Sequence, residues 1–318
     1  MKAAVVNGAG KAPVYGDFME PSAQPGKMLV NVTASALSRV TKSRASGAHY
    51  SSSGQFPFVA GVDGVGRLHD GRRVLFLLPD APFGAMAERT VVAASRCVPV
   101  PDDVDDVTAA AIANPGLSSW AALRERARLL PGENVLVNGA TGTSGRLAVQ
   151  IAKHLGARKV VATGRNAADL AELKSLGADE TLLLTLPPED LEAALIDHFQ
   201  KGIDVVVDYL WGTSAEAIIV AAAKGGKDAV PVRFVEVGSA SGSEITLPSA
   251  ALRSSALMLM GSGVGSIGVD GLVKVVDEVL RAVVPAKLQI QTKAVPLTEI
   301  ERLWNEDSGK SRLVFMVG

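Results

Sequence analysis

Segment 134–145 constrains the fold of this chain most strongly, because an aliphatic run passes directly into a glycine-rich turn and then into a helical pattern. Residues 135–138 have the composition of a buried parallel strand, and apolar side chains recur at helical spacing over residues 144–155. Such a turn lets backbone N–H groups approach a pyrophosphate, and the helix N-terminus adds unpaired donors and a positive dipole end. The segment therefore predicts a dinucleotide-binding site, with close strand–helix packing as the alternative interpretation. The residues of the turn are Gly139, Ala140, Gly142 and Gly145.

The end of the next predicted strand indicates which dinucleotide is bound. This strand covers residues 159–163 and is followed by Gly164 and Arg165, with no carboxylate at its tip. An Asp or Glu here would accept a hydrogen bond from a free ribose 2′-hydroxyl, whereas a guanidinium can bind a 2′-phosphate through two hydrogen bonds. Arg165 therefore favours NADPH over NADH, unless it is a solvated arginine of a surface loop.

Composition narrows the classes of partner. The chain has 318 residues, a formal net charge of -1 and 20% charged residues, so we expect a small-molecule partner and no nucleic acid. Cys97 is the single cysteine, which excludes a disulfide framework and is typical of the reducing cytoplasm. The apolar stretches 107–123 and 254–269 are interrupted by proline or glycine, and the N-terminal apolar run is too short for a signal peptide. We therefore expect no membrane segment and a cytoplasmic location.

The chain changes character near residue 117. Residues 1–101 contain short apolar runs separated by Gly, Pro, Ser and Asp, which indicates an irregular β-rich module. From 117 onward, strands and helices alternate, and this alternation predicts an α/β, doubly wound parallel sheet. The predicted strands are 135–138, 159–163, 181–185, 204–209, 232–237 and 256–260, and the predicted helices are 144–155, 167–176, 189–200 and 213–223. The tail after residue 268 is predicted to return to the first module, since about fifty residues would struggle to form a core alone.

Several segments together resemble the medium-chain dehydrogenase/reductase superfamily, and within it the zinc-free quinone oxidoreductase (zeta-crystallin-like) branch. The resemblance runs from end to end of the chain. It implies a GroES-like β-rich catalytic domain over residues 1–116 and 268–318, a Rossmann NADPH-binding domain over 117–267, and substrate bound between them. The segments that resemble the family are 34–50, 57–66, 114–123, the glycine turn, 176–179, 204–208, 235–242 and 309–314.

The departures from the zinc-dependent relatives concern the metal site. Those relatives have a metal-binding cysteine near Leu37 and Ser38 and a His-Glu pair after the glycine that corresponds to Gly61, but here Val62 and Asp63 follow that glycine. A catalytic zinc needs three protein ligands and an open position. The resemblance therefore implies no metal, and hydride transfer from NADPH to a small molecule that is already electrophilic, such as a quinone or an α,β-unsaturated carbonyl.

The family pattern also assigns candidate catalytic residues. It implies that Ser38, Thr41, Lys42 and Tyr50 line the substrate side of the nicotinamide. Tyr50 is the best candidate proton donor by its chemistry, and a loop tyrosine without a catalytic role is the alternative. Thr41 and Ser38 replace an acidic residue and an asparagine that are common in the family, which alters the polar network.

On the cofactor side, the resemblance assigns residues to each part of NADPH. Trp211 could instead be core packing, and Lys310 could be a solvated turn residue. The assignments are Gly142, Thr143 and Ser144 at the pyrophosphate; Thr163, Gly164 and Arg165 at the 2′-phosphate; Leu210 and Trp211 after the fourth strand; Val237, Gly238 and Ser239 beside the nicotinamide; Asn114 at the carboxamide or substrate; and Lys310 or Arg312 closing over the phosphates.

Two further expectations concern assembly and activity. The apolar run 256–260 would lie at the open edge of the sheet, and an exposed edge invites pairing with a second copy, so we expect a homodimer. Three alternatives to a quinone or enone reductase stay open. They are a cofactor-binding redox-sensing or structural protein with little turnover, an enoyl-thioester reductase, and an alcohol dehydrogenase.

Overall fold

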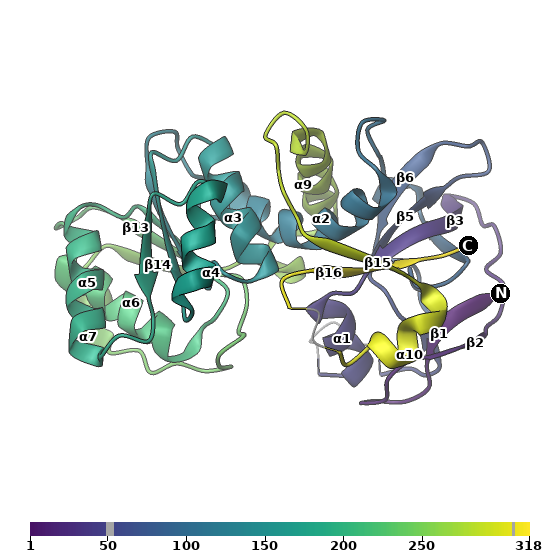
Figure 1. Cartoon of the computed structure of the whole chain (residues 1–318), viewed down its shortest axis with the longest axis horizontal. Helices are drawn as coiled ribbons and strands as arrows, with labels where there is room; N and C mark the ends of the chain where they lie inside the picture. The colour runs from purple at the N-terminus through teal and green to yellow at the C-terminus, as the bar shows by residue number, and fades with distance from the viewer. Residues whose placement is uncertain (49–53, 307–308) are drawn as a thin grey trace. The chain divides into compact units, whose positions relative to one another are not determined.

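A computed structural model describes residues 1–48, 54–306 and 309–318 of the chain (Figure 1). The chain divides into two compact units. One unit combines Met1–Asn114 with Val269–Gly318, and the other is Pro115–Gly268. No helix in the described residues is long and apolar enough to cross a membrane.

Unit Pro115–Gly268 is built on a six-stranded sheet in the order β11-β10-β9-β12-β13-β14. Every neighbouring pair in this sheet is parallel, so the doubly wound parallel sheet predicted from the alternation is confirmed. Its strands are β9 (Asn134–Asn138), β10 (Lys159–Gly164), β11 (Glu180–Leu183), β12 (Val205–Asp208), β13 (Val232–Glu236) and β14 (Leu257–Gly261).

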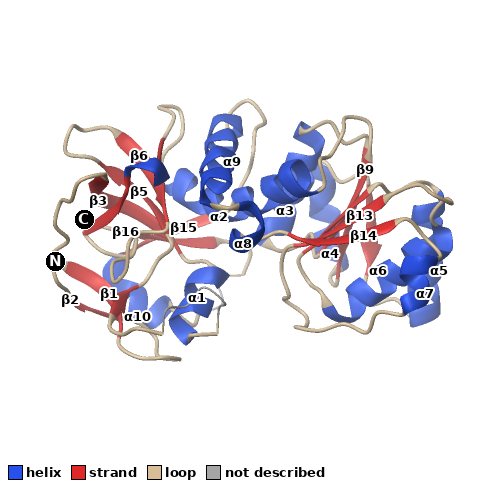
Figure 2. Ribbon diagram, turned by 180° about the vertical axis from the view of Figure 1, so that it is seen from behind, coloured by secondary structure: helices blue, strands red, loops and turns tan. Residues whose placement is uncertain are grey.

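Helices cover both faces of this sheet (Figures 1 and 2). The helix predicted over 167–176 is shorter, because the last four residues tighten into a 3₁₀ turn that ends at Gly177 with φ 107°. The helices are α3 (Thr143–His154), α4 (Ala167–Glu172), α5 (Pro188–Gln200), α6 (Gly212–Gly225), α7 (Ser249–Arg253) and α8 (Val264–Ile267).

The core of this unit explains why its strands form. Leu136, Val206 and Phe234 project from three adjacent strands and pack against Phe199 of α5 and Ile218 of α6. All five side chains are at most 1% exposed. Strands buried on both faces read as nearly continuous aliphatic runs, which is why they were predictable from composition.

The other unit is rich in β-structure. Its strands form a three-stranded sheet, β2-β1-β4, and a seven-stranded sheet, β15-β16-β3-β5-β6-β8 with β7 paired to β3. Its strands are β1 (Lys2–Val6), β2 (Val14–Asp17), β3 (Lys27–Ala36), β4 (Phe58–Val59), β5 (Asp63–Arg67), β6 (Arg73–Leu77), β7 (Arg89–Ala93), β8 (Cys97–Pro99), β15 (Thr292–Pro296) and β16 (Arg312–Met316). Its helices are α1 (Arg39–Ser46), α9 (Val269–Ala282) and α10 (Ile300–Leu303), and α2 (Asp106–Ala121) runs from this unit into the other.

The C-terminal strand completes the larger sheet of this unit. Strand β16 runs antiparallel to β3 with Val314 opposite Ala36, and the Leu37 N–H donates to the Leu313 carbonyl at 2.9 Å. Phe315 is fully buried in a core that also contains Met86 and Trp304. Segments far apart in the sequence thus form one β-rich unit separate from the parallel sheet.

Candidate functional site

The glycine turn lies between β9 and α3, where its geometry depends on the absence of side chains. Gly139 has φ 82°, and a Cβ there would lie 2.8 Å from Cγ of Leu210. A Cβ on Gly145 would lie 2.5 Å from Cα of Ala140 and still closer to the Gly139 carbonyl oxygen. Gly142 caps α3 without any side-chain hydrogen bond, so the first N–H groups of the helix are left for a ligand. This turn fits the pyrophosphate of a dinucleotide.

Four polar residues lie in one row at or next to the ends of four adjacent strands. Asn138 stands opposite Asp208, and Asp208 stands opposite Glu236, in the parallel register of β9, β12 and β13. Thr163 of β10 lies one position beyond the pair Ala162–Val137 and therefore opposite Asn138. Thr163, Asn138 and Asp208 are completely buried. The row lies at the carboxyl ends of the strands, where doubly wound sheets bind ligands.

Hydrogen bonds connect this row to the turn. The Gly139 N–H donates to Thr163 Oγ1 at 3.2 Å, Thr163 Oγ1 donates to Asn138 Oδ1 at 2.7 Å, and Asn138 Nδ2 donates to Asp208 Oδ1 at 2.8 Å. Burial raises the pKa of Asp208, although hydrogen bonds to its carboxylate oppose the shift. Burial and the charge of Asp208 raise the pKa of Glu236.

The other residues predicted at the cofactor occupy varied positions in this unit. Arg165 is exposed directly after β10, and Thr143 and Ser144 lie in the first turn of α3. Val237 and Gly238 are half-buried after β13, whereas Ser239 is exposed. The side chain of Trp211 packs against the apolar core and meets Phe234 edge to face, as the core interpretation expects.

In the β-rich unit, two predicted catalytic hydroxyls form a buried pair. Ser38 caps α1, accepting a hydrogen bond from the Thr41 N–H at 3.0 Å, and the two side-chain oxygens are 2.8 Å apart. Their exposed fractions are 3% and 2%. Lys42 follows on the same helix. Tyr50 lies outside the described residues, so its position relative to this pair is not part of the structure.

Arg312 and Asp63 lie in the β-rich unit and interact electrostatically. Within the described residues, neither carboxylate oxygen of Asp63 has a hydrogen-bond partner, and the same holds for Nε and Nη2 of Arg312. Burial raises the pKa of Asp63 to about 6, although the charge of Arg312 opposes the shift. Burial also lowers the pKa of Arg312. The carboxylate and two of the guanidinium nitrogens thus face the protein interior.

Asn114 and Lys310, the remaining predicted cofactor residues, are half-buried. Asn114 lies within α2, at the end of the first segment of the β-rich unit, and Lys310 lies two residues before β16. Sequence reasoning assigned no role to Asn138 or Asp208. The available signal was a polar residue that closes an aliphatic strand, as in Val205–Asp208.

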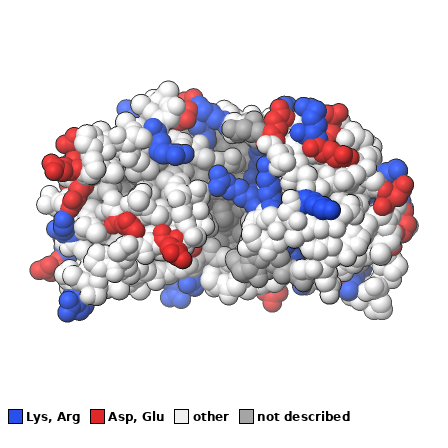
Figure 3. Space-filling view, turned by 90° about the horizontal axis from the view of Figure 1, so that it is seen from below, with Lys and Arg blue, Asp and Glu red and all other residues white. Residues whose placement is uncertain are grey.

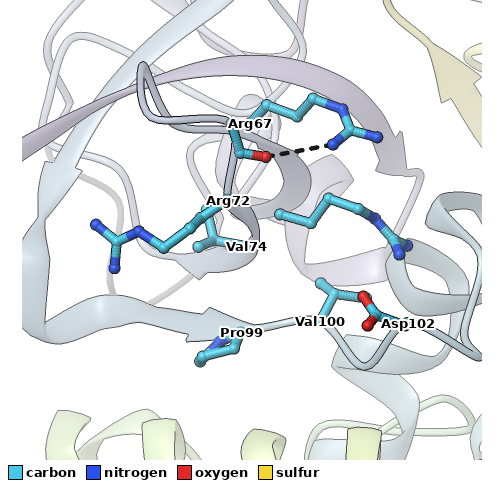
Figure 4. A pocket seen from close by; sticks show the side chains of 8 residues that line it. Arg67, Arg72, Val74, Pro99, Val100 and Asp102 are labelled. Carbon is cyan, nitrogen blue, oxygen red and sulfur yellow. Dashed lines mark hydrogen bonds between the residues drawn. The ribbon is translucent and has the colours of Figure 1, made fainter.

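A separate pocket of about 330 Å³ lies on the β-rich unit (Figure 4). Three of the residues that line it are arginines, but each has a partner. Arg67 donates to the Gly71 carbonyl, Arg72 pairs with Asp70, and Arg73 pairs with Asp106. None of the predicted catalytic or cofactor residues that the structure describes lines this pocket. Figure 3 shows that one face of the molecule carries both basic and acidic side chains.

The chain is similar in sequence to several known proteins. Residues 145–282 match the zinc-binding dehydrogenase family, a match that begins at the last glycine of the turn and does not include Val62 or Asp63. The chain is 26% identical to the "Probable NADPH-dependent quinone reductase tdiC" of Emericella nidulans, over 96% of each protein. It is 29% identical to prostaglandin reductase-3 of Bos taurus, over 66% of this chain and 58% of that protein.

A solved structure has a similar fold. The quinone oxidoreductase of Thermus thermophilus, which was also solved in complex with NADPH, superimposes with a TM-score of 0.81. The two sequences are 27% identical, and the superposition covers 100% of both chains. The two-part architecture described above is therefore the architecture of that enzyme.

The close approach at Gly145 predicts a large cost for a single methyl group. Gly145→Ala should lower the free energy of unfolding by about 1–3 kcal/mol, because the new Cβ forces the backbone of the turn to move. Chemical denaturation measures this change. Gly265→Ala is the matched control, since this helical glycine has nothing within 4 Å of a built Cβ and alanine favours a helix. Equal stabilities for the two variants would contradict the prediction.

The buried carboxylate of Asp63 predicts a specific pH dependence of stability. The folded pKa of Asp63 lies above its ordinary value of 3.8, at about 6, so the folded state binds more protons than the unfolded state in this window. The free energy of unfolding should therefore fall as the pH rises from 4 to 6, with about 2 kcal/mol of this fall due to Asp63. Asp63→Asn should remove this contribution in denaturation curves across the window, whereas Asp270→Asn, at an exposed acid, should retain it. A slope that Asp63→Asn does not change would be the contrary result.

Proposed function

Because the chain belongs to the medium-chain dehydrogenase/reductase superfamily, in its zinc-free quinone oxidoreductase branch, we propose that it transfers hydride from NADPH to a quinone or an α,β-unsaturated carbonyl. The observation that supports this most directly is the cradle of Gly139, Gly142 and Gly145 at the N-terminus of α3. Bound NADPH supplies the hydride. The residues of the chain bind the cofactor, orient it and provide or admit a proton.

Zinc independence is part of this proposal. Val62 stands where the zinc-dependent relatives have a metal-binding histidine. Among the described residues, no group of three His, Cys, Asp or Glu side chains could hold a metal ion. A quinone or an enone needs no Lewis acid to accept hydride, because its carbonyl already withdraws electrons from the reacting carbon. We also propose a cytoplasmic location, which the single cysteine supports.

Turnover separates an enzyme from a cofactor-binding protein. We expect steady NADPH oxidation with a simple quinone and with an enone, followed by absorbance. Tight NADPH binding without turnover of quinones, enones, aldehydes or enoyl-thioesters would instead favour the binding protein. A preference for the enoyl-thioester, or for alcohol oxidation, would select one of the other two alternatives.

Tyr50 is proposed as the proton donor for an enone. Tyr50→Phe should reduce turnover of an enone by about 10²-fold and leave NADPH binding unchanged, since positioned proton transfer contributes that much. A quinone should be affected less, because its reduced anion is stabilised and takes protons from water. Steady-state rates on both acceptors measure the difference. Tyr15→Phe, in β2, is the control and should match the wild type; equal rates for Tyr50→Phe and the wild type on both acceptors would remove Tyr50 from the mechanism.

Arg165 is proposed to select NADPH through the 2′-phosphate. A hydrogen bond to a charged group contributes about 1.5–3 kcal/mol, so Arg165→Ala should weaken NADPH binding by roughly ten- to a hundredfold and leave NADH almost unchanged. Titration of both cofactors by fluorescence gives the two dissociation constants. Lys174→Ala, another exposed cation of the same unit, should change neither. Equal losses for NADPH and NADH would show that Arg165 has a structural role.

A homodimer through β14 is also proposed. This strand ends the parallel sheet, pairing with β13 alone in the described part of the chain, and Met258 on it is 49% exposed. A charge on this edge should oppose pairing with a second copy, so Met258→Lys should convert dimer to monomer in sedimentation at micromolar concentration. Leu130→Lys is the control at another exposed apolar residue, and it should stay dimeric. A monomeric wild-type protein would refute the assembly.

A further inference from the structure

We propose that Asp208 is the positioning residue of the cofactor site, whose carboxylate joins the glycine turn at Gly139 to the loop at Leu210 and Trp211. This inference rests on the proposed function, because it concerns how the chain holds NADPH. The side-chain carboxylate of Asp208 accepts hydrogen bonds from Asn138, Leu210 and Trp211. Its effect passes through the residues that it holds in place.

Hydrogen bonds to Thr163 hold the start of the glycine turn in place. The Gly139 N–H donates to the Thr163 hydroxyl at 3.2 Å, and the Ala140 N–H donates to the Thr163 carbonyl at 2.8 Å. These two donors therefore point into the protein and not toward a ligand. The Thr163 hydroxyl in turn donates its proton to Asn138, and the Asn138 amide donates to Asp208. The start of the turn is thus tied to the carboxylate two strands away from β10.

Hydrogen bonds to the Asp208 carboxylate hold the loop after β12 in place. Asp208 Oδ1 accepts hydrogen bonds from the N–H groups of Leu210 at 2.9 Å and Trp211 at 3.2 Å, and Oδ2 accepts from Trp211 at 3.1 Å. Trp211 has φ 57° and ψ -159°, a conformation that costs a non-glycine residue energy unless its surroundings hold it. The hydrogen bonds from the Trp211 N–H to the Asp208 carboxylate hold this backbone conformation. In this conformation the Leu210 side chain closes over Gly139, where a Cβ would lie 2.8 Å away.

The loop after β13 is hydrogen-bonded to the main chain of Asp208. The Asp208 carbonyl accepts hydrogen bonds from the N–H groups of Val237 at 2.8 Å and Gly238 at 3.2 Å. These residues belong to the segment predicted beside the nicotinamide. One buried residue therefore connects the turn, the loop at 210–211 and the loop after β13.

The chemistry of the position requires a carboxylate facing an amide. Asp208 receives three N–H donors on its side chain and donates to none, which suits an acceptor-only group. Asn138 has one acceptor for Thr163 and one amide group for Asp208, so its orientation is defined by its neighbours. A carboxylate at 138 would face the carboxylate at 208 with no donor between them. An amide at 208 fits less well too, because Oδ1 of Asp208 accepts both from Asn138 and from the Leu210 N–H, and an amide nitrogen in that place could accept neither bond.

Substitution of either member of the pair is the test. Asn138→Asp and Asp208→Asn should each weaken NADPH binding at least about tenfold, and the double variant Asn138→Asp/Asp208→Asn should lose clearly less affinity than the two single losses added together, because both changes act on one hydrogen bond. Titration of the full chain with NADPH, together with the thermal unfolding midpoint, gives both readouts. Ser214→Ala is the control. It removes the hydroxyl that accepts from Asn138 Nδ2 at 2.9 Å and donates to the Trp211 carbonyl at 3.4 Å, but it leaves every hydrogen bond of Asp208 in place, so it should bind NADPH like the wild type. A merely structural defect would lower the midpoint and leave the affinity of the folded protein for NADPH unchanged.

Each outcome decides between the inference and the proposed function. Single losses of NADPH affinity that simply add in the double variant overturn the inference. If Asn138→Asp does not fold, Thr163→Val removes only the hydroxyl between Gly139 and Asn138, and unchanged NADPH affinity in that variant overturns the inference. A wild type that binds NADPH but reduces no acceptor overturns the hydride-transfer proposal alone. A wild type that does not bind NADPH overturns both.

Discussion

The hydrogen bond between Asn138 and Asp208 is the interaction on which the candidate site depends. It links two strands, β9 and β12, that are neighbours in the sheet but 70 positions apart in the chain. These strands lie where the order of the sheet reverses, because the chain runs outward from β9 through β10 and β11 before it returns to β12. Doubly wound sheets bind ligands at such a reversal. Side chains that face each other there can be bridged only if the register is fixed.

The apolar core fixes that register. Leu136, Val206 and Phe234 lie two positions before Asn138, Asp208 and Glu236, and successive side chains of a strand alternate between faces. Each polar residue therefore lies on the same face as the core residue before it. A shift of one residue would move every apolar side chain to the opposite face, so the packing that stabilises the sheet also aligns the polar row. Burial of Asp208 is the cost of this alignment, and its hydrogen bonds offset it.

The sequence predicted the parallel sheet well because its strands are buried and its helices are amphipathic. The six strands lie within two residues of their predicted ends, and the glycine turn falls between strand and helix as expected. Helices α7 and α8 were not predicted, since five and four residues are too few to show a periodic pattern. The role of Asp208 was also beyond prediction. It follows from strand order and register, which bring Asn138 and Thr163 beside it and which a single sequence does not specify.

Two residues that the family pattern assigns to the cofactor have polar atoms that lie in the protein interior. The family pattern associates Thr163 with the 2′-phosphate, yet its hydroxyl is fully buried and already engaged by Gly139 and Asn138. Arg312 was expected to close over phosphates, yet two of its nitrogens are buried and interact electrostatically with Asp63. In each case the residue type suited the ligand, but the fold gave its polar atoms partners or surroundings within the protein. Arg165 differs from both, because it is exposed directly after its strand, and this exposure supports the proposal that it binds the 2′-phosphate.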